Sequence, residues 1–222
     1  MKDRRQRFAK VHAIVPVKVL KLSKLRLSSV LTPAERAQFS VAMLTDTLEA
    51  LRKVKRLDSV TVVSADSAVG KIARSHGARW LWEGKRRGLN KAVRLAIREA
   101  KHKRASAALI MPADIPLITP REIVDFLDHA AGYSVGLTPS KDGTGTNALL
   151  MHPPGIIQPH FGRNSFQRHL AIADRQSVSR RVIRRTGIGF DVDEPKDFRW
   201  LMHHDVSNET GRFLREVRRR PR

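Results

Sequence analysis

Two acidic stretches of the chain follow apolar segments and could bind a divalent cation. Asp114 comes after the apolar segment 107–111, and Asp191 and Asp193 lie at the end of the segment 187–192. Alternate residues of a strand point to the same side, so the last two carboxylates would share one face. Carboxylates together with phosphate oxygens are typical ligands of Mg²⁺. The alternative is that Asp193 or Glu194 caps a helix beginning at Pro195, and the two roles can coexist.

A basic loop follows the apolar segment 11–17 and could bind a polyphosphate. It carries four cations, Lys18, Lys21, Lys24 and Arg26. An open α/β sheet receives its ligand at the carboxyl ends of its strands, which is where this loop would lie. The loop contains no Walker motif, because no Gly-x-x-x-x-Gly-Lys-Ser/Thr run is present. A solvated basic loop is the alternative interpretation.

Two polar loops further along the chain could bind an anionic substrate. Residues 141–147, Lys-Asp-Gly-Thr-Gly-Thr-Asn, offer backbone amides and hydroxyls, although they could also form a plain turn. Residues 161–166 lead into an expected helix, whose first amides and positive dipole end favour a phosphate or a carboxylate. A simple Asn or Ser cap would explain the second loop as well.

Several kinds of chemistry are excluded. The chain contains no cysteine, which excludes disulfides, thiolate zinc sites, iron–sulfur clusters and a thiol nucleophile. The nine histidines lack metal-ligand spacing, and no nucleophile-elbow sequence supports Ser-His-Asp catalysis. The reaction must therefore depend on oxygen and nitrogen groups.

The elements that must position these groups alternate between strand and helix. Thr32, Pro33 and Glu35 form a capping-box sequence, which predicts a helix beginning at Pro33. Repeated strand–helix units predict an α/β fold with a mostly parallel, doubly wound sheet and flanking helices. Strands are expected at 11–17, 59–64, 78–82, 107–111, 134–138, 147–151, 178–185 and 187–192. Further helices are expected to start near Asp66, Asn90, Pro120, Asn164 and Pro195.

Length and charge define the expected domain organisation. The chain has 222 residues and a net charge of +22, of which +4 lies in residues 1–10 and +5 in residues 212–222. We expect a basic N-terminal tail at 1–10, a single domain at 11–204 and a basic C-terminal tail at 205–222. No run approaches the length of a transmembrane segment and no cleavable signal is evident, so a cytoplasmic protein is expected. Aromatic residues form only 5% of the chain, which leaves only weak contact of the tails with nucleic acid or an anionic surface.

Short motifs follow one another along residues 11–200. They are, in order, Ile14-Val15-Pro16-Val17-Lys18, Lys24-Leu25-Arg26-Leu27, Leu31-Thr32-Pro33-Ala34-Glu35-Arg36, Val62-Val63-Ser64, Gly88-Leu89-Asn90, Pro112-Ala113-Asp114-Ile115-Pro116, Gly145-Thr146-Asn147-Ala148-Leu149, Phe161-Gly162 through His169, and Asp191-Val192-Asp193. Together these motifs resemble the 2-phospho-L-lactate guanylyltransferase family, which acts in coenzyme F-420 biosynthesis. The usual Lys-Ser-Arg-Leu motif of that family reads Lys24-Leu25-Arg26-Leu27 here, which keeps the two charges and loses a hydroxyl.

The resemblance implies an enzyme of the nucleotide-diphospho-sugar transferase fold. It would join GMP from GTP to 2-phospho-L-lactate, phosphoenolpyruvate or 3-phospho-D-glycerate and release pyrophosphate, with Mg²⁺ as cofactor. By this resemblance, Mg²⁺ would be held by Asp114, Asp191 and Asp193, and catalysis would use Asp114, Lys24 and Arg26. The phospho-acid would be held by Thr146, Gly162 and Ser165, and the nucleotide by Pro16, Lys18, Ser64, Gly88, Leu89 and Asn90.

A reaction of this kind needs no general base, because the attacking phosphate oxygen is already anionic at neutral pH. Positioning and charge neutralisation would then be the work of the protein. Three alternatives stay open: the identity of the phospho-acid, another nucleotidyltransferase activity on the same fold, and an RNA-binding protein on an inactive fold. Assembly as a homodimer is open as well.

Overall fold

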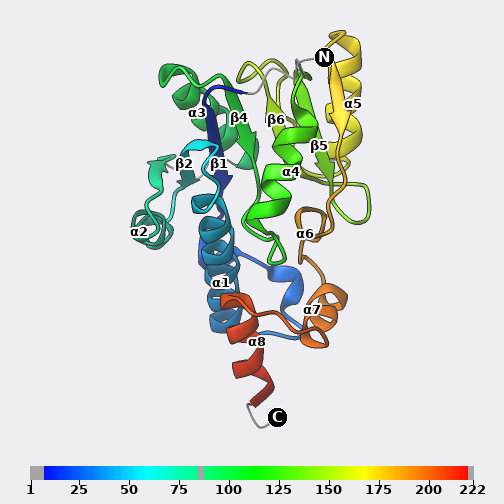
Figure 1. Cartoon of the computed structure of the whole chain (residues 1–222). Coiled ribbons are helices and arrows are strands. Elements are labelled where there is room, and N and C mark those ends of the chain that lie inside the picture. The colour runs from blue at the N-terminus through cyan, green and yellow to red at the C-terminus, as the bar shows by residue number, and fades with distance from the viewer. Residues whose placement is uncertain (1–7, 85–87, 220–222) are drawn as a thin grey trace.

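A seven-stranded sheet forms the centre of the molecule in a computed structural model, which describes residues 8–84 and 88–219 (Figure 1). The strand order is β3-β2-β1-β4-β6-β5-β7. Strand β6 runs antiparallel to both of its neighbours, and every other pair of adjacent strands is parallel. The predicted mostly parallel sheet is confirmed. The strands are β1 (Val11–Pro16), β2 (Leu57–Ser64), β3 (Arg79–Trp82), β4 (Ala107–Ile110), β5 (Val135–Pro139), β6 (Thr146–Met151) and β7 (Arg180–Val182).

Helices cover both faces of the sheet and bury two separate apolar clusters. On one face, residues of α1, α2 and α4 pack against strand residues such as Val15 and Leu109. On the other face, α3 and α5 pack against residues such as Ile14 and Ile110. Neighbouring residues of one strand thus enter opposite clusters, as the alternation of a pleated strand requires. The helices are α1 (Pro33–Arg52), α2 (Ser67–Ser75), α3 (Leu89–His102), α4 (Pro120–Ala130), α5 (Ser165–Arg175), α6 (Thr186–Gly189), α7 (Pro195–Met202) and α8 (Glu209–Arg219), with short 3₁₀ turns η1 (Leu20–Leu22) and η2 (Leu25–Leu27).

The helix starts follow their capping residues. The Thr32 backbone N–H donates to the Glu35 carboxylate at 2.8 Å, and the Glu35 N–H donates to the Thr32 hydroxyl at 3.3 Å, which completes the predicted capping box of α1. The Asp66 carboxylate accepts from the Ala68 N–H at 2.9 Å and caps α2. The same carboxylate accepts from the Leu20 N–H at 3.0 Å, so it also ties down the basic loop after β1.

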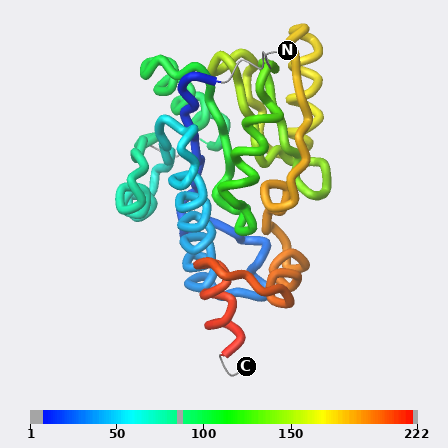
Figure 2. The backbone as a smooth tube through the Cα atoms, in the orientation of Figure 1, coloured from blue at the N-terminus to red at the C-terminus, as the bar shows by residue number. Residues whose placement is uncertain are grey.

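The C-terminal residues differ from the expected basic tail. Residues 209–219 form helix α8, which lies beside α1 (Figure 2). Phe213 and Leu214 are buried in a third apolar cluster with residues of α1 and α7. The carboxylate of Asp46, on α1, accepts from the backbone N–H groups that begin α8. Residues 212–219 contain four Arg, which made the segment resemble a charged tail. The segment is an amphipathic helix, and its apolar side completes this cluster. The domain therefore extends through at least residue 219, while the predicted tail residues 1–7 and 220–222 lie outside the described part.

A second difference concerns the segment 187–192, which was expected to be a strand. It contains the end of the single-turn helix α6 and an irregular connection to α7. The Gly187 N–H donates to the Glu122 carboxylate at 2.8 Å, and a Cβ at Gly187 would collide with that side chain and with the Leu117 backbone. This close approach of two backbones takes the place of strand pairing. Similarly, β7 covers only Arg180–Val182 of the expected 178–185.

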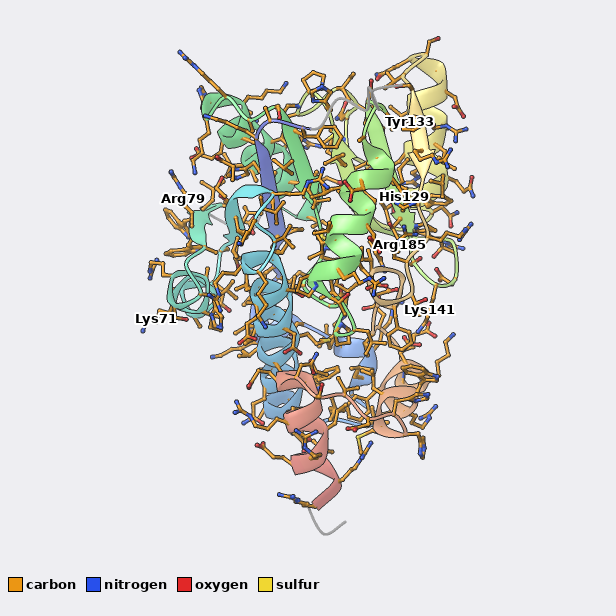
Figure 3. All side chains as sticks on the ribbon, viewed as in Figure 1. Lys71, Arg79, His129, Tyr133, Lys141 and Arg185 are labelled. Carbon is orange, nitrogen blue, oxygen red and sulfur yellow. The ribbon has the colours of Figure 1, made fainter. Side chains whose placement is uncertain are left out.

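The positive charge is spread over the surface. Figure 3 shows nitrogen-tipped side chains projecting on all sides, among them Lys71 on α2, Arg79 on β3 and Arg185 before α6. The predicted basic cluster at Lys85, Arg86 and Arg87 lies outside the described residues. Across residues 8–84 and 88–219, no helix is both long and apolar enough to cross a bilayer.

Candidate active site

A cleft of about 770 Å³ opens at the carboxyl ends of β1 and β4, where an open α/β sheet normally binds its ligand. Most of the residues predicted from the sequence meet on its lining. These are Pro16, Lys18, Lys24, Arg26, Leu89, Asp114, Thr146, Gly162, Ser165, Asp191 and Asp193.

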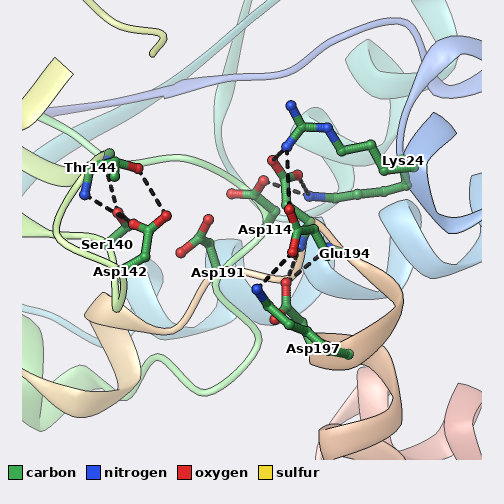
Figure 4. A network of polar contacts seen from close by, with 12 residues as sticks. Lys24, Asp114, Ser140, Asp142, Thr144, Asp191, Glu194 and Asp197 are labelled. Atoms are coloured by element: carbon green, nitrogen blue, oxygen red, sulfur yellow. Dashed lines mark hydrogen bonds and ion pairs between the residues drawn. The ribbon is translucent and has the colours of Figure 1, made fainter. Parts of the chain in front are cut away.

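Lys24 connects two of the predicted carboxylates. Its Nζ lies 2.6 Å from Asp114 Oδ2 and 3.0 Å from Asp193 Oδ1, and its side chain is only 8% exposed (Figure 4). Burial alone would lower the pKa of Lys24, but the two carboxylates raise it above its ordinary value. Lys24 is therefore a fixed cation at neutral pH. Its backbone has φ 52°, a left-handed conformation that non-glycine residues adopt at some cost and often at functional sites.

Asp191 completes a group of four side chains that we call the carboxylate cluster, with Lys24, Asp114 and Asp193. Burial, together with the charge of Asp114, raises the pKa of Asp191. No cation among the described residues pairs with this carboxylate. The Asn147 amide donates to it at 3.2 Å and to the Gly189 carbonyl at 3.1 Å, which fixes its orientation. A half-buried carboxylate that has no cationic partner among the described residues and lies beside a second carboxylate is a place where an additional cation would be favourable.

Two carboxylates of the cluster, those of Asp114 and Asp191, suit a Mg²⁺ ion that also binds substrate phosphates. No three or more of the described His, Asp and Glu side chains group as a ready-made metal site. Mg²⁺ is commonly bound by one or two carboxylates plus substrate phosphates, and Asp114 with Asp191 can supply these. Asp193 differs, because Lys24 already holds it. Burial would raise the pKa of Asp193, but the charge and hydrogen bond of Lys24 lower it overall.

The helix-capping alternative is confirmed at Glu194, which is the N-cap residue of α7 and forms a capping box with Asp197. Asp197, in the first turn of α7, accepts from the backbone N–H groups of Asp193 at 3.0 Å and Glu194 at 2.8 Å. Lys141 pairs with the other oxygen of Asp197 and lies over the Phe190 ring. These contacts order the acidic loop before α7 and leave the Asp193 side chain free to meet Lys24.

The remaining basic residues of the first loop are exposed. The Arg26 side chain is 71% exposed and lies 3.8 Å from Asp193, which is a weak, screened ion pair. Lys18 is also exposed. Leu25, which replaces the serine of the family motif, is 57% exposed, so its side chain is not part of the apolar core.

A second, uncharged group lines the cleft beside the carboxylate cluster. The hydroxyls of Thr146 and Ser165, which we call the hydroxyl pair, lie 3.3 Å apart. Both residues are buried, and Thr146 Oγ1 lies 3.0 Å from Nδ1 of the fully buried His169. Thr146 begins β6, Ser165 begins α5 and His169 lies one turn further along that helix.

The start of α5 offers fewer free amides than the sequence suggested. The Ser165 N–H donates to the Gly162 carbonyl at 3.0 Å, and the Phe166 N–H donates to the Thr144 carbonyl at 3.2 Å. Asn164, which precedes the helix, has φ 56° and makes no side-chain capping bond. At the start of α5, the hydrogen-bond donors available to a ligand are therefore mainly side-chain hydroxyls and not backbone N–H groups.

Three predicted nucleotide-binding residues do not line the cleft. Ser64 is buried, and its hydroxyl accepts from the Asp66 N–H at 3.1 Å. The Asn90 side chain both donates to and accepts from the Phe161 backbone, at 3.0 and 2.7 Å, and thereby holds the loop before α5. Gly88 precedes α3 with φ 86°. In this structure Ser64 and Asn90 support loops that border the cleft.

Sequence reasoning did not single out Asn147, Lys141 or His169 individually. Asn147 orients Asp191, Lys141 holds Asp197, and His169 touches the hydroxyl pair. Asn147 and Lys141 lie in the polar loop 141–147, so a signal was present, but their partners are about 50 residues away along the chain. The pairing depends on the fold.

The chain matches a family model described as "Guanylyl transferase CofC like" over residues 11–220. It is 43% identical to a phosphoenolpyruvate guanylyltransferase of Rubrobacter xylanophilus, covering 84% of this chain and 91% of that protein. It is 33% identical to a 2-phospho-L-lactate guanylyltransferase of Methanobrevibacter smithii, covering 94% and 91%.

Solved structures show the same fold at low identity. A putative nucleotide-diphospho-sugar transferase from Desulfovibrio desulfuricans G20 superposes with a TM-score of 0.77 at 15% identity, covering 94% of this chain and 96% of that one. A nucleotidyl transferase from Methanothermobacter gives a TM-score of 0.64 at 15% identity, covering 93% and 98%. These likenesses confirm the predicted fold class.

Proposed function

Because the chain belongs to the CofC-like guanylyl transferase family, and is thus an enzyme of the nucleotidyltransferase type, we propose that it transfers the guanylyl group of GTP to a phosphorylated three-carbon acid. Pyrophosphate would leave, and the product would carry a new diphosphate link. The names of the relatives support phosphoenolpyruvate or 2-phospho-L-lactate as the acid, and 3-phospho-D-glycerate is a third candidate. The product would be used in coenzyme F-420 biosynthesis.

One observation carries the proposal: a single cleft holds a buried lysine between carboxylates and, beside them, a pair of uncharged hydroxyls. The reaction brings two polyanions together. Like charges about 4 Å apart repel by roughly 4 kcal/mol per unit pair at an effective dielectric of about 20. A site for this reaction therefore needs cations near the phosphates and neutral donors that orient the acid.

The steps require no proton transfer from the protein. A phosphate oxygen of the acid attacks the α-phosphorus of GTP, and the bond from that phosphorus to the pyrophosphate oxygen breaks in line. Lys24 and Arg26 would offset the negative charge of the phosphates, and Lys18 would approach the triphosphate from the exposed edge. Thr146, Ser165 and Gly162 would hold the acid.

We propose that Asp114 and Asp191 hold the Mg²⁺ ion, with Asp193 kept close by Lys24. When bound, the ion would neutralise and orient the phosphates of GTP. Pro16 and Leu89 would border the nucleotide, while Ser64, Gly88 and Asn90 would support that side of the cleft.

The direct test is to incubate the purified protein with GTP, Mg²⁺ and each of the three acids, and to measure pyrophosphate release and product mass. We expect pyrophosphate and a guanosine diphosphate-linked acid with at least one of them. Reactions with CTP or ATP in place of GTP are the matched controls, and turnover with CTP alone would indicate another nucleotidyltransferase of this fold. Absence of pyrophosphate with every acid and nucleotide would refute the proposal.

A further inference from the structure

His169 is a buried histidine on α5 whose two ring nitrogens contact different parts of the cleft border. Nε2 lies 2.8 Å from the backbone N of His160, and Nδ1 lies 3.0 Å from Thr146 Oγ1. The residue is completely buried, and its ring packs edge-on against Phe161 at 5.1 Å between centroids. Such a ring is held in one orientation.

The contact with His160 determines where the proton of His169 lies. A backbone N–H can only donate, so Nε2 must be the acceptor and carry no proton. The single proton of the neutral ring is then on Nδ1. Burial lowers the pKa of His169 to about 4, so the ring is neutral at physiological pH. Nδ1–H therefore donates to Thr146 Oγ1.

This donation determines what the hydroxyl pair can offer to a ligand. Thr146 Oγ1 accepts from His169 Nδ1 and lies within hydrogen-bond distance of Ser165 Oγ. Two hydroxyl protons are then available for one contact between the two oxygens. Within the described part of the chain, neither hydroxyl has another acceptor, so one O–H is left to point into the cleft. That group would meet a ligand as a hydrogen-bond donor.

We propose that His169 is a positioning residue that turns the hydroxyl pair of Thr146 and Ser165 into a donor for an anionic oxygen of the phospho-acid. The inference rests on the proposed function and adds the cause of the hydroxyl orientation. Without the imidazole donor, Thr146 Oγ1 loses its fixed donor partner, and the single hydrogen bond between the two hydroxyls could run in either direction. The ligand would then have to select one of these arrangements at a cost in affinity.

Two conservative substitutions separate the contacts of His169. In His169→Asn the amide NH₂ can occupy the position of Nδ1 and donate to Thr146, while the contact with His160 is lost. In His169→Gln the amide oxygen can occupy the position of Nε2 and accept from His160, while the donation to Thr146 is lost. Both variants remove the same ring, so a role in ring packing would affect them alike, and a role through the His160 contact alone would affect His169→Asn more than His169→Gln.

The experiment measures KM for the phospho-acid and for GTP in the wild type and both variants, with and without Thr146→Val, after thermal melts confirm folding. We expect His169→Gln to raise KM for the acid roughly tenfold, with KM for GTP unchanged, and His169→Asn to stay close to wild type. In the Thr146→Val background the two variants should have equal KM values for the acid.

The outcomes are distinguishable from failure of the proposed function. If the wild type turns over none of the acids, the guanylyl transfer proposal fails. If the wild type turns over but His169→Asn and His169→Gln have the same KM for the acid, His169 has no positioning role. The inference is also overturned if His169→Gln keeps its effect in the Thr146→Val background, because the effect would not act through that hydroxyl.

Discussion

The carboxylate cluster and the hydroxyl pair lie in one cleft but are stabilised in opposite ways. Lys24, Asp114 and Asp193 are held mainly by each other, so a charged ligand or ion must replace existing ion pairs. The hydroxyls of Thr146 and Ser165 are held by a neutral imidazole and have a donor left over. In this cleft, the charged side chains form ion pairs that a ligand can replace, whereas the orientation of the hydrogen-bond donors is determined by uncharged, buried side chains.

The largest expected effect is in the carboxylate cluster. Asp114→Asn removes one partner of Lys24 and one proposed Mg²⁺ ligand, and we expect pyrophosphate release to fall by about 10³-fold with the fold intact. Steady-state turnover measured beside circular dichroism checks this. Asp128→Asn, on the outer side of α4, is the matched control and should keep activity. Near-normal turnover of Asp114→Asn would remove Asp114 from the mechanism.

Removing the cation of the same cluster should have a smaller effect. Lys24→Met leaves Asp114 and Asp193 without their shared ammonium, and we expect turnover to fall by about 10²-fold and KM for GTP to rise. The dependence on Mg²⁺ concentration should remain, because the carboxylates remain. Lys71→Met, on the surface of α2, is the control. Equal activities of these two variants would show that the Lys24 ammonium does not contribute to turnover.

A substitution in the hydroxyl pair should mainly weaken the binding of the phospho-acid. Ser165→Ala removes one uncharged donor, and we expect KM for the phospho-acid to rise by roughly five- to tenfold, with a smaller change in kcat. Initial rates at varied acid concentration measure this, with Ser75→Ala as control. A large loss of kcat with unchanged KM would contradict the division of roles between the two groups.

The smallest effect on activity is expected at a third kind of polar site, a carboxylate that binds the backbone N–H groups at the start of α8. Asp46 accepts from the N–H groups of Glu209 and Thr210, and burial raises its pKa to about 6. Its folded pKa exceeds the unfolded value, so its contribution to stability is full below about pH 4 and is lost as the pH rises through 6.

Asp46→Asn removes this titration and keeps one of the two oxygens that accept from the backbone N–H groups of α8. Relative to the variant, the wild type should lose roughly 2–3 kcal/mol of unfolding free energy between about pH 4 and pH 7. Urea unfolding across this pH range measures the difference, and activity at pH 7 should not change. Parallel pH profiles for the two proteins would show that burial of Asp46 costs nothing.

Local rules explain which parts of the fold could be predicted. Thr32, Asp66 and Thr119 cap helices through bonds to residues two or three positions away, so a sequence reader sees both partners. The segment 187–192 was misassigned because its conformation depends on Glu122, 65 residues from Gly187. The C-terminal helix was missed for a similar reason, since the apolar surface that receives Phe213 belongs to α1 and α7.

The candidate site shows the same limit. Order along the chain was sufficient to bring Lys24, Asp114 and Asp193 to one cleft, because the strands before the first two are parallel neighbours. The sequence does not show that Lys24 would lie between the carboxylates. It also did not separate residues that line the cleft, such as Leu89, from residues that support it, such as Asn90.

The antiparallel strand β6 has a consequence for how this site can be altered. Because β6 runs against its neighbours, its first residues, not its last, reach the cleft. Thr146 contacts His169 and the next residue, Asn147, contacts Asp191, so a single peptide unit separates the hydroxyl pair from the residue that orients a proposed Mg²⁺ ligand. A one-residue shift in the register of β6 would exchange the faces of both side chains at once, so the proposed acid and metal sites cannot be altered one at a time by sliding this strand.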